Sequence, residues 1–494
     1  MDPFNKLPVE LRVQVLIHTY SRHSMLQVAQ ASPAMLGGYS SSRTYLTRML
    51  VETNLDHGMM KDAMAIVLFP PWDESDTYRS MVESHLHVWA AQKMPNPIEK
   101  QNLRVIDQLD RLRSRLLLFI GDYLTKAMAV FPPREYLCLP TLSSTQAHTT
   151  FKDQIVSARF DTANLTDAEK KRLLRAFLRY ELLSKILNPQ NQGIVHLDWD
   201  ALYKYSGQWY HPSEQEALKC VEQYLASLYG AMLAQCGDSW LPETPSSNIL
   251  SPSCVTSTEL LYPDTLYFNA EAYASDLGLR ILANDLHFGG PIGGSVSNSI
   301  TLAYLGFGLA TTLVRSAISG KDGRDYLKQW FIDWYRSREE RLLYYNSPLI
   351  GLVLPPELDQ KEHCQEGPGM YQELSRRTSN PSSWEQEAIY RQRAWAFFDD
   401  ARCYPSLSTP SHFPTLQELK MQSDAMQAAP YSSKWAHARA LRRSQKWHDE
   451  QLGRFFVDQQ DEEPQRLTLE MFFQPLLPWD IHERHFGELA PFWQ

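Results

Sequence analysis

Two histidines near the end of the sequence have a spacing that could bind zinc. The stretch His482-Glu483-Arg484-His485 separates its imidazoles by three positions, so a helix would bring both to one face. Zinc proteases space their two histidines by four positions and use the intervening Glu as a base. With the shorter spacing Glu483 is not placed as in that motif, and no third ligand is apparent. The sequence therefore predicts neither a metal site nor a cofactor.

A glycine-rich stretch offers a second chemical interpretation. Residues 289–294, Gly-Gly-Pro-Ile-Gly-Gly, could present backbone N–H groups to an anion. No Gly-Lys-Ser/Thr follows, and residues 279–287 before it have helical character, so a turn between helices explains the stretch better. The sequence also lacks a Gly-x-Ser-x-Gly elbow and a Cys–His pairing signal. We expect an interaction protein and not an enzyme; a helical enzyme with a pocket near 289–294 is the competing class.

Charge and composition restrict the partners. The 48 basic and 57 acidic residues give a net charge of −9, which argues against nucleic acid. Lys and Arg do interleave with Trp435 and Trp447, but a solvated cationic face explains this pattern better than phosphate binding. The uncharged stretch 289–314 contains Pro291 and three Thr, so we expect a buried helix and no membrane span. The six cysteines form no C-x-x-C pair, and no secretory signal is present, so we expect an intracellular protein, cytoplasmic or nuclear.

Periodicity predicts a mainly α fold with few or no strands. Apolar residues step by three or four through residues 98–131. Three pairs have capping-box spacing and predict helix starts: Ser24 with Gln27, Thr166 with Glu169, and Ser213 with Glu216. Further helices are predicted at 43–51, 58–68, 270–287, 296–318, 323–345, 383–400, 411–427 and 434–457. Short strands are possible at 194–199 and 349–354, and surface loops are predicted at 240–252 and 355–383.

The aromatic residues between 326 and 335 follow helical spacing. Their positions are 326, 330, 331, 334 and 335, on one side of a predicted helix. Burial in the core is the default interpretation of such a row. If part of it is exposed, its aromatic rings beside several Arg would suit a peptide groove.

The first helix is apolar on too many sides. Pro8 stands at its first turn, where the missing N–H costs nothing. Two apolar stripes follow on neighbouring sides: Val9, Val13, Leu16 and Tyr20, then Leu11, Val15 and Thr19. The short helices around it form a unit too small to enclose this surface. The surplus is therefore expected to be buried against the rest of the chain or against another protein.

The residues of this helix resemble the start of an F-box. The stretch Leu7-Pro8-x-Glu10-Leu11-x-x-x-Val15-Leu16 matches that start, Met25 to Ser32 lies where the second helix would be, and Arg43 to Met49 where the third would be. Residues 56–70 resemble the continuation found in F-box-like proteins of filamentous fungi, and residues 393–402 resemble a Trp/Phe-Asp element of the same group.

The resemblance implies a division of labour along the chain. Residues 1–55 would be a three-helix motif that docks on the Skp-type adaptor of a cullin-based (SCF-type) ubiquitin ligase. Residues 56–494 would form one large helical domain that recognises an unknown protein substrate. The implied adaptor-binding residues are Leu7, Pro8, Glu10, Leu11, Val15, Leu26 and Val28. Val9, Val13 and Leu16 would hold the motif's own core. A helical scaffold with a degenerate F-box is the alternative.

Overall fold

The structure is a computed structural model whose described part is mainly α-helical. It describes residues 2–19, 22–71, 77–99, 102–129, 131–141, 147–152, 154–187, 212–237, 239–241, 267–270, 302–338, 384–399 and 413–417, with the single residues 273, 277, 402 and 419. Within these ranges one two-stranded sheet accompanies the helices. The prediction of a mainly α fold is confirmed.

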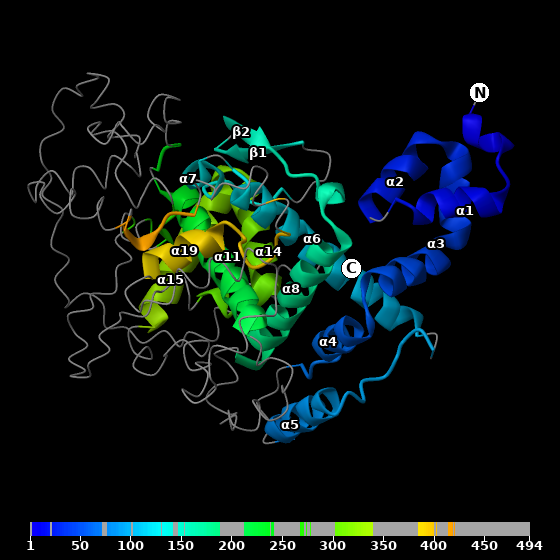
Figure 1. The fold of residues 1–494 in the computed structure, drawn as a ribbon, viewed down its shortest axis with the longest axis horizontal. Coiled ribbons are helices and arrows are strands. Elements are labelled where there is room, and N and C mark those ends of the chain that lie inside the picture. Colours follow the sequence, from blue (N-terminus) through cyan, green and yellow to red (C-terminus); the bar gives the residue numbers. More distant parts are fainter. Residues whose placement is uncertain are drawn as a thin grey trace, which may run out of the picture.

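A small helical unit at the N-terminus stands apart from a larger body (Figure 1). Its elements are the 3-10 helix η1 (Pro3–Lys6) and the helices α1 (Val9–Ile17), α2 (Arg22–Ala31) and α3 (Pro33–Asn54). Helix α3 packs against α1 and α2 through Met35, Leu46 and Leu50, and it also packs against α6 (Leu103–Ala127) of the body. Within the described residues, α3 is therefore the main connection between the unit and the body.

The body is a set of helices around one large core. Its other elements are α4 (His57–Val67), α5 (Thr77–Ala90), α7 (Pro132–Glu135), η2 (Thr162–Asn164), α8 (Asp167–Leu187), α11 (Pro212–Cys236), α14 (Gly306–Ile318), α15 (Lys321–Arg338) and α19 (Trp384–Gln392). Helix α8 packs against α4, α6, α11 and α14, and α11 also packs against α15 and α19. The core is therefore shared by helices that lie far apart in the sequence.

Side-chain caps explain where several helices begin. Thr166 and Glu169 form the predicted capping box: each backbone N–H donates to the other's side chain, at 2.9 and 3.2 Å. The Asn102 side chain accepts from Val105 N, so α6 begins at Leu103 and not at residue 98 as predicted. The predicted start at Ser24 was wrong, because α2 begins at Arg22.

The third helix of the unit is longer than predicted. It begins at Pro33 and not near Arg43. Ser32 caps it, since its Oγ accepts from Met35 N at 3.1 Å. Proline suits the first position of a helix as well as the position after one. The Ser32-Pro33 pair therefore ends α2 and starts α3 at once.

A hairpin in the body was not predicted. Strands β1 (His148–Phe151) and β2 (Gln154–Ala158) pair antiparallel, and Lys152 in their turn has φ 44°. The Lys152 ammonium donates to the carbonyls of Gly237 and Ser239, at 2.8 and 2.9 Å, just after α11 ends. These two hydrogen bonds fix the hairpin on the body. The strands considered at 194–199 and 349–354 lie outside the described residues.

Residues 393–399 are almost entirely buried and tie the late part of the chain to the early helices. Arg172 on α8 donates to the Phe397 carbonyl and pairs with Asp399 at 2.5 Å. The Trp395 indole donates to Glu216 on α11 at 3.1 Å. Arg402 pairs with Glu169 at 2.9 Å. The Trp/Phe-Asp element of the sequence therefore forms part of the core.

Two glycines with positive φ should respond differently to Ala. Gly306 has φ +77°, and a Cβ there would lie 2.9 Å from Glu181 Oε2 and 3.0 Å from Ser184 Cβ. Gly306→Ala should therefore destabilise the body by about 3 kcal/mol or more, from backbone strain plus overlap. Denaturant unfolding of the full chain measures the loss.

Gly320 is the matched control, since its φ is +91° and a Cβ there would have no neighbour within 4 Å. Gly320→Ala should cost only the backbone strain, about 1–2 kcal/mol. Equal losses in the two variants would contradict the packing role of Gly306.

Candidate docking surface

The N-terminal unit has a small hydrophobic core of its own. Its buried members are Leu16, Met25, Met35, Leu46 and Leu50, and Phe4, Val13, Ile17, Val28 and Tyr39 pack against them while partly buried. Val13 and Leu16 thus lie where the F-box resemblance places them, on the inner side of α1. This core holds the three helices together.

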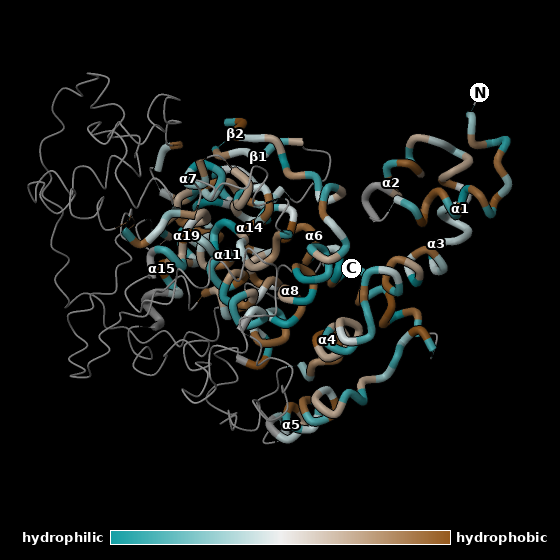
Figure 2. The backbone as a smooth tube through the Cα atoms, viewed as in Figure 1, coloured by the Kyte–Doolittle hydropathy of each residue, from teal (hydrophilic) through white to brown (hydrophobic). Residues whose placement is uncertain are grey.

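The outer side of α1 carries apolar residues. Leu11 is 50% exposed and Val15 is 37% exposed. They are four residues apart and therefore share one face of the helix, on a different side of it from Val13 and Leu16. Apolar residues recur along α1 in Figure 2. Exposed apolar residues gathered on one face are typical of an interaction surface.

The other predicted docking residues are placed less uniformly. Pro8 and Glu10 are exposed, and Leu7 is half-buried. Pro8 precedes α1, and its carbonyl accepts from Arg12 N at 3.1 Å, so it starts the helix. Leu7 and Pro8 lie between the end of η1 and the start of α1, and we call this pair the Leu7–Pro8 corner. On α2, Leu26 and Val28 are half-buried, and Val28 packs on the small core. Their role in docking stays a prediction.

One residue expected in the core of the unit is outside it. Val9 is 48% exposed. It is the first residue of α1, and the small core lies further along the helix, at Val13, Leu16 and Ile17. Val9 therefore adds to the exposed apolar surface near the corner.

Two exposed apolar residues on α3 were missed. Leu36 and Tyr45 are each about half exposed, and they are nine positions apart, which puts them on opposite sides of the helix. The Ser32-Pro33 pair could have revealed Leu36, because it marks a helix start at Pro33 and Leu36 then lies in the first turn of that helix. Gly37 and Gly38 lowered the helical signal of this stretch.

Polar contacts tie the corner to the start of α3. The Asp2 carboxylate accepts from Phe4 N at 2.9 Å, Ser32 Oγ at 2.6 Å and Ala34 N at 3.2 Å. The bond from Ser32 lowers the pKa of Asp2, so it is a carboxylate at neutral pH. Arg12 Nε donates to the Leu7 carbonyl at 2.9 Å, and its Nη1 donates to the Ala34 carbonyl at 3.3 Å.

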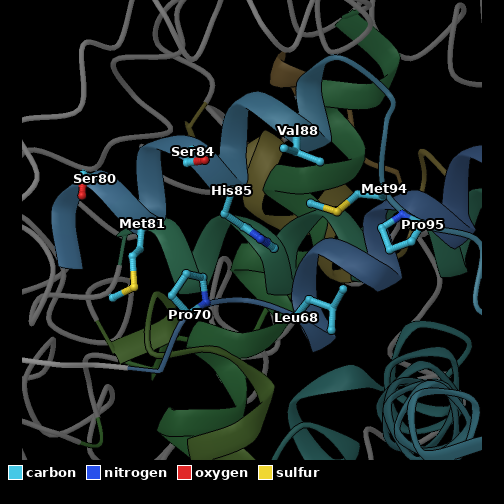
Figure 3. A pocket seen from close by; sticks show the side chains of 9 residues that line it. All are labelled: Leu68, Pro70, Ser80, Met81, Ser84, His85, Val88, Met94 and Pro95. Carbon is cyan, nitrogen blue, oxygen red and sulfur yellow. The ribbon is translucent and has the colours of Figure 1, made fainter. Parts of the chain in front are cut away.

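A second surface feature is an open apolar pocket of about 540 Å³ beside α5 (Figure 3). It is lined by Leu68, Pro70, Ser80, Met81, Ser84, His85, Val88, Met94 and Pro95. His85 points between α5 and the loop that follows α4. Its Nε2 lies 2.8 Å from the Ala65 carbonyl, and burial lowers the pKa of the imidazole below 6.5. With Nε2 as the donor to that carbonyl, Nδ1 is an acceptor. The pocket thus offers apolar walls and one neutral imidazole.

The aromatic row on α15 is mainly structural. Phe331 is buried, and Trp330 and Trp334 pack against the core while stacking on each other, with ring centroids 6.4 Å apart. Tyr326 is half-buried. The other segments considered as binding sites, at 289–294, 434–448 and 482–485, lie outside the described residues.

The two sides of α1 should differ in what they contribute to stability. Leu16→Ala removes a buried side chain from the small core and should destabilise the unit by about 1–3 kcal/mol. Leu11→Ala removes an exposed side chain and should stay within about 0.5 kcal/mol of the original stability. Hydrogen exchange of the α1 and α2 amides reports the unit separately from the body, because α3 packs in both cores. Comparable losses in both variants would mean that Leu11 serves the fold.

The half-buried imidazole of His85 should make stability depend on pH. Because the pKa of His85 is lower in the folded protein than the ordinary 6.5, the unfolded chain binds its proton first on acidification. The contribution of neutral His85 to the stability of the fold is complete above about pH 6.5, and it is lost as the pH falls toward the pKa of the folded state. His85→Gln keeps an N–H donor for the Ala65 carbonyl without titrating. Its melting temperature should therefore fall less than that of the wild type between pH 7.5 and 5, and equal slopes would contradict this origin.

The described residues include no group of three or more His, Cys, Asp or Glu side chains placed to hold a metal ion. None of the helices in that part of the chain combines the length and apolar character needed to cross a membrane. Comparisons with protein-family models, curated proteins and solved structures find no match to this chain.

Proposed function

We propose that this protein is an F-box-like substrate-recognition subunit of a cullin-based ubiquitin ligase. Its N-terminal unit docks on a Skp-type adaptor, and its helical body binds a protein that is to be ubiquitinated. The observation that carries the proposal is the exposed apolar face of α1, with Leu11 and Val15, on a unit that stands apart from the body.

The form of the N-terminal unit supports docking over self-burial. If the apolar surplus of α1 served the chain's own fold, Leu11 and Val15 would be packed against the body. They are exposed instead, whereas Val13 and Leu16 supply the packing that the unit needs. An apolar helix face beside an exposed Pro8 gives an adaptor both area and a distinctive shape to recognise.

The connection between unit and body supports a role in presentation. Helix α3 runs without interruption from the small core, where Leu50 packs, into the large core, where Val51 packs, and Leu55 joins the large core just after the helix ends. A partner on α1 would therefore be held at a fixed position relative to anything bound by the body. Ubiquitin transfer to a bound protein needs such a fixed arrangement.

Binding of a Skp-type adaptor tests the proposal directly. The full chain, tagged at its C-terminus, should bind the purified adaptor from the source organism and co-purify with cullin from its cells. Replacing Leu7 and Pro8 together by Ala should weaken adaptor binding by about tenfold or more, because hot-spot residues carry most of an interface's energy. Leu11→Glu should do the same, because it places a charge in an apolar contact. Calorimetry or interferometry measures both.

Leu103→Ala is the matched control, since Leu103 is an exposed Leu on α6 of the body. It should bind the adaptor as the wild type does. The Leu7/Pro8 variant should unfold within about 1 kcal/mol of the wild type, because neither residue is fully buried. A folded wild type that binds neither adaptor nor cullin would refute the ligase role and leave a helical scaffold. A much earlier melt of the double variant would mean that the corner serves its own fold.

A further inference from the structure

The first turn of the described chain is held in place mainly by polar bonds. No residue of η1 is buried, and Phe4 packs on the small core only in part. The Asp2 carboxylate caps η1 through Phe4 N and reaches the start of α3 through Ser32 and Ala34, which are 30 and 32 positions away in the sequence. A carboxylate at this place also satisfies a free N–H of the first turn of α3 and faces the positive end of its dipole.

Arg12 reaches the same place from the other side of the corner. Its guanidinium bridges two carbonyls, Leu7 O inside the corner and Ala34 O on α3. The planar fork of Arg can hold two acceptors in fixed directions, which a Lys ammonium cannot do. The stem of Arg12 lies against Gly38: a Cβ at Gly38 would be 3.7 Å from Arg12 Cβ. Helix α1 is thereby held close to α3.

Both polar contacts converge on one residue of α3. The Ala34 N–H donates to Asp2, and the Ala34 carbonyl accepts from Arg12. Asp2 thus fixes the chain before the corner, and Arg12 fixes the corner itself through the Leu7 carbonyl. Within the corner, Leu7 N donates to Phe4 O at 3.1 Å. These bonds therefore add to the small core in fixing the position of Leu7 and Pro8 relative to α3.

We propose that Asp2 and Arg12 are positioning residues of the docking surface, which hold the Leu7–Pro8 corner on α3 in the conformation that the adaptor binds. This inference rests on the proposed function. A preformed corner costs the adaptor no ordering of the chain on binding. When only a fraction of the molecules has the corner in place, the apparent affinity falls to that fraction of its intrinsic value.

We call the contacts of Asp2 and Arg12 with α3 and the corner the clamp. Two substitutions break it without replacing Leu7, Pro8 or the exposed apolar residues of α1. Asp2→Asn preserves the shape of the side chain and one acceptor for Phe4 N, but its amide nitrogen cannot accept from Ala34 N. Arg12→Gln removes the fork that joins the two carbonyls. Each variant should bind the Skp-type adaptor about threefold to tenfold more weakly than the wild type, the range expected for one or two lost hydrogen bonds. Arg12→Lys, which can reach one carbonyl, should restore part of the affinity.

Hydrogen exchange in the free protein gives the readout that separates positioning from folding. The amides of Leu7 and Ala34 should exchange faster in Asp2→Asn, whereas the buried part of α3 around Leu46 and Leu50 stays protected as in the wild type. The double variant should lose less affinity than the product of the two single losses, because both bonds act through Ala34. Arg48→Gln is the matched control: Arg48 pairs with Glu52 at 3.9 Å on an exposed part of α3, and its removal should change neither readout.

The outcomes distinguish this inference from the proposed function. Unchanged adaptor affinity in Asp2→Asn and Arg12→Gln, with binding lost in the Leu7/Pro8 variant, would overturn the clamp and leave the docking role intact. A fall in the unfolding midpoint of the unit that accounts for the whole loss of affinity would make both residues structural and overturn positioning. A wild type that does not bind the adaptor would overturn the proposed function, and this role with it.

Discussion

Two hydrophobic cores are joined through one helix, and the arrangement of the protein depends on that sharing. Leu50 packs in the core of the N-terminal unit, and the next residue, Val51, packs in the core of the body. Successive residues of a helix point about 100° apart, so α3 turns one side to each core at this step. A bend or a loop at this point would uncouple the unit from the body. The Ser32 cap and the Pro33 start place the beginning of this helix beside the Leu7–Pro8 corner.

Buried charges hold the body in one arrangement. Lys126 is fully buried on α6 and lies 2.7 Å from Asp122, which also accepts from Tyr224 on α11 at 2.8 Å. Arg391 on α19 pairs with Glu216 on α11 at 2.6 Å. Removing one member of such a pair leaves an unpaired charge in the core, whereas an apolar replacement of both members is far less costly. These pairs therefore specify which helices are neighbours, while the apolar contacts supply the driving force for burial.

Local patterns in the sequence predicted individual helices better than they predicted which helices pack together. The apolar period and the Thr166/Glu169 box predicted α6 and α8, because both signals lie within a few residues of the element they describe. Nothing in the sequence relates Glu216 to Arg391, since the partners of an ion pair follow no period. The hairpin was missed because its strands are short and carry no two-residue turn signature. On α1 the period predicted two apolar stripes, and the F-box resemblance assigned Val9, Val13 and Leu16 to the core of the unit. That assignment was wrong for Val9, because a stripe does not show where a neighbouring core ends.

The pairing of α8 and α11 with residues 391–402 has a consequence for the order of events during synthesis. Glu216 leaves the ribosome 175 residues before Arg391, and Glu169 leaves it 233 residues before Arg402. At about 5–20 residues per second, a gap of 175 residues corresponds to roughly 10–35 s. The N-terminal unit, whose contacts are local, can fold within that interval. Helix α11 meanwhile exposes the side that α19 later covers, and α8 exposes the side that Phe397, Asp399 and Arg402 later contact. The nascent body therefore exposes surface that the folded protein buries until residue 402 has left the ribosome, and it is most prone to aggregate during this interval.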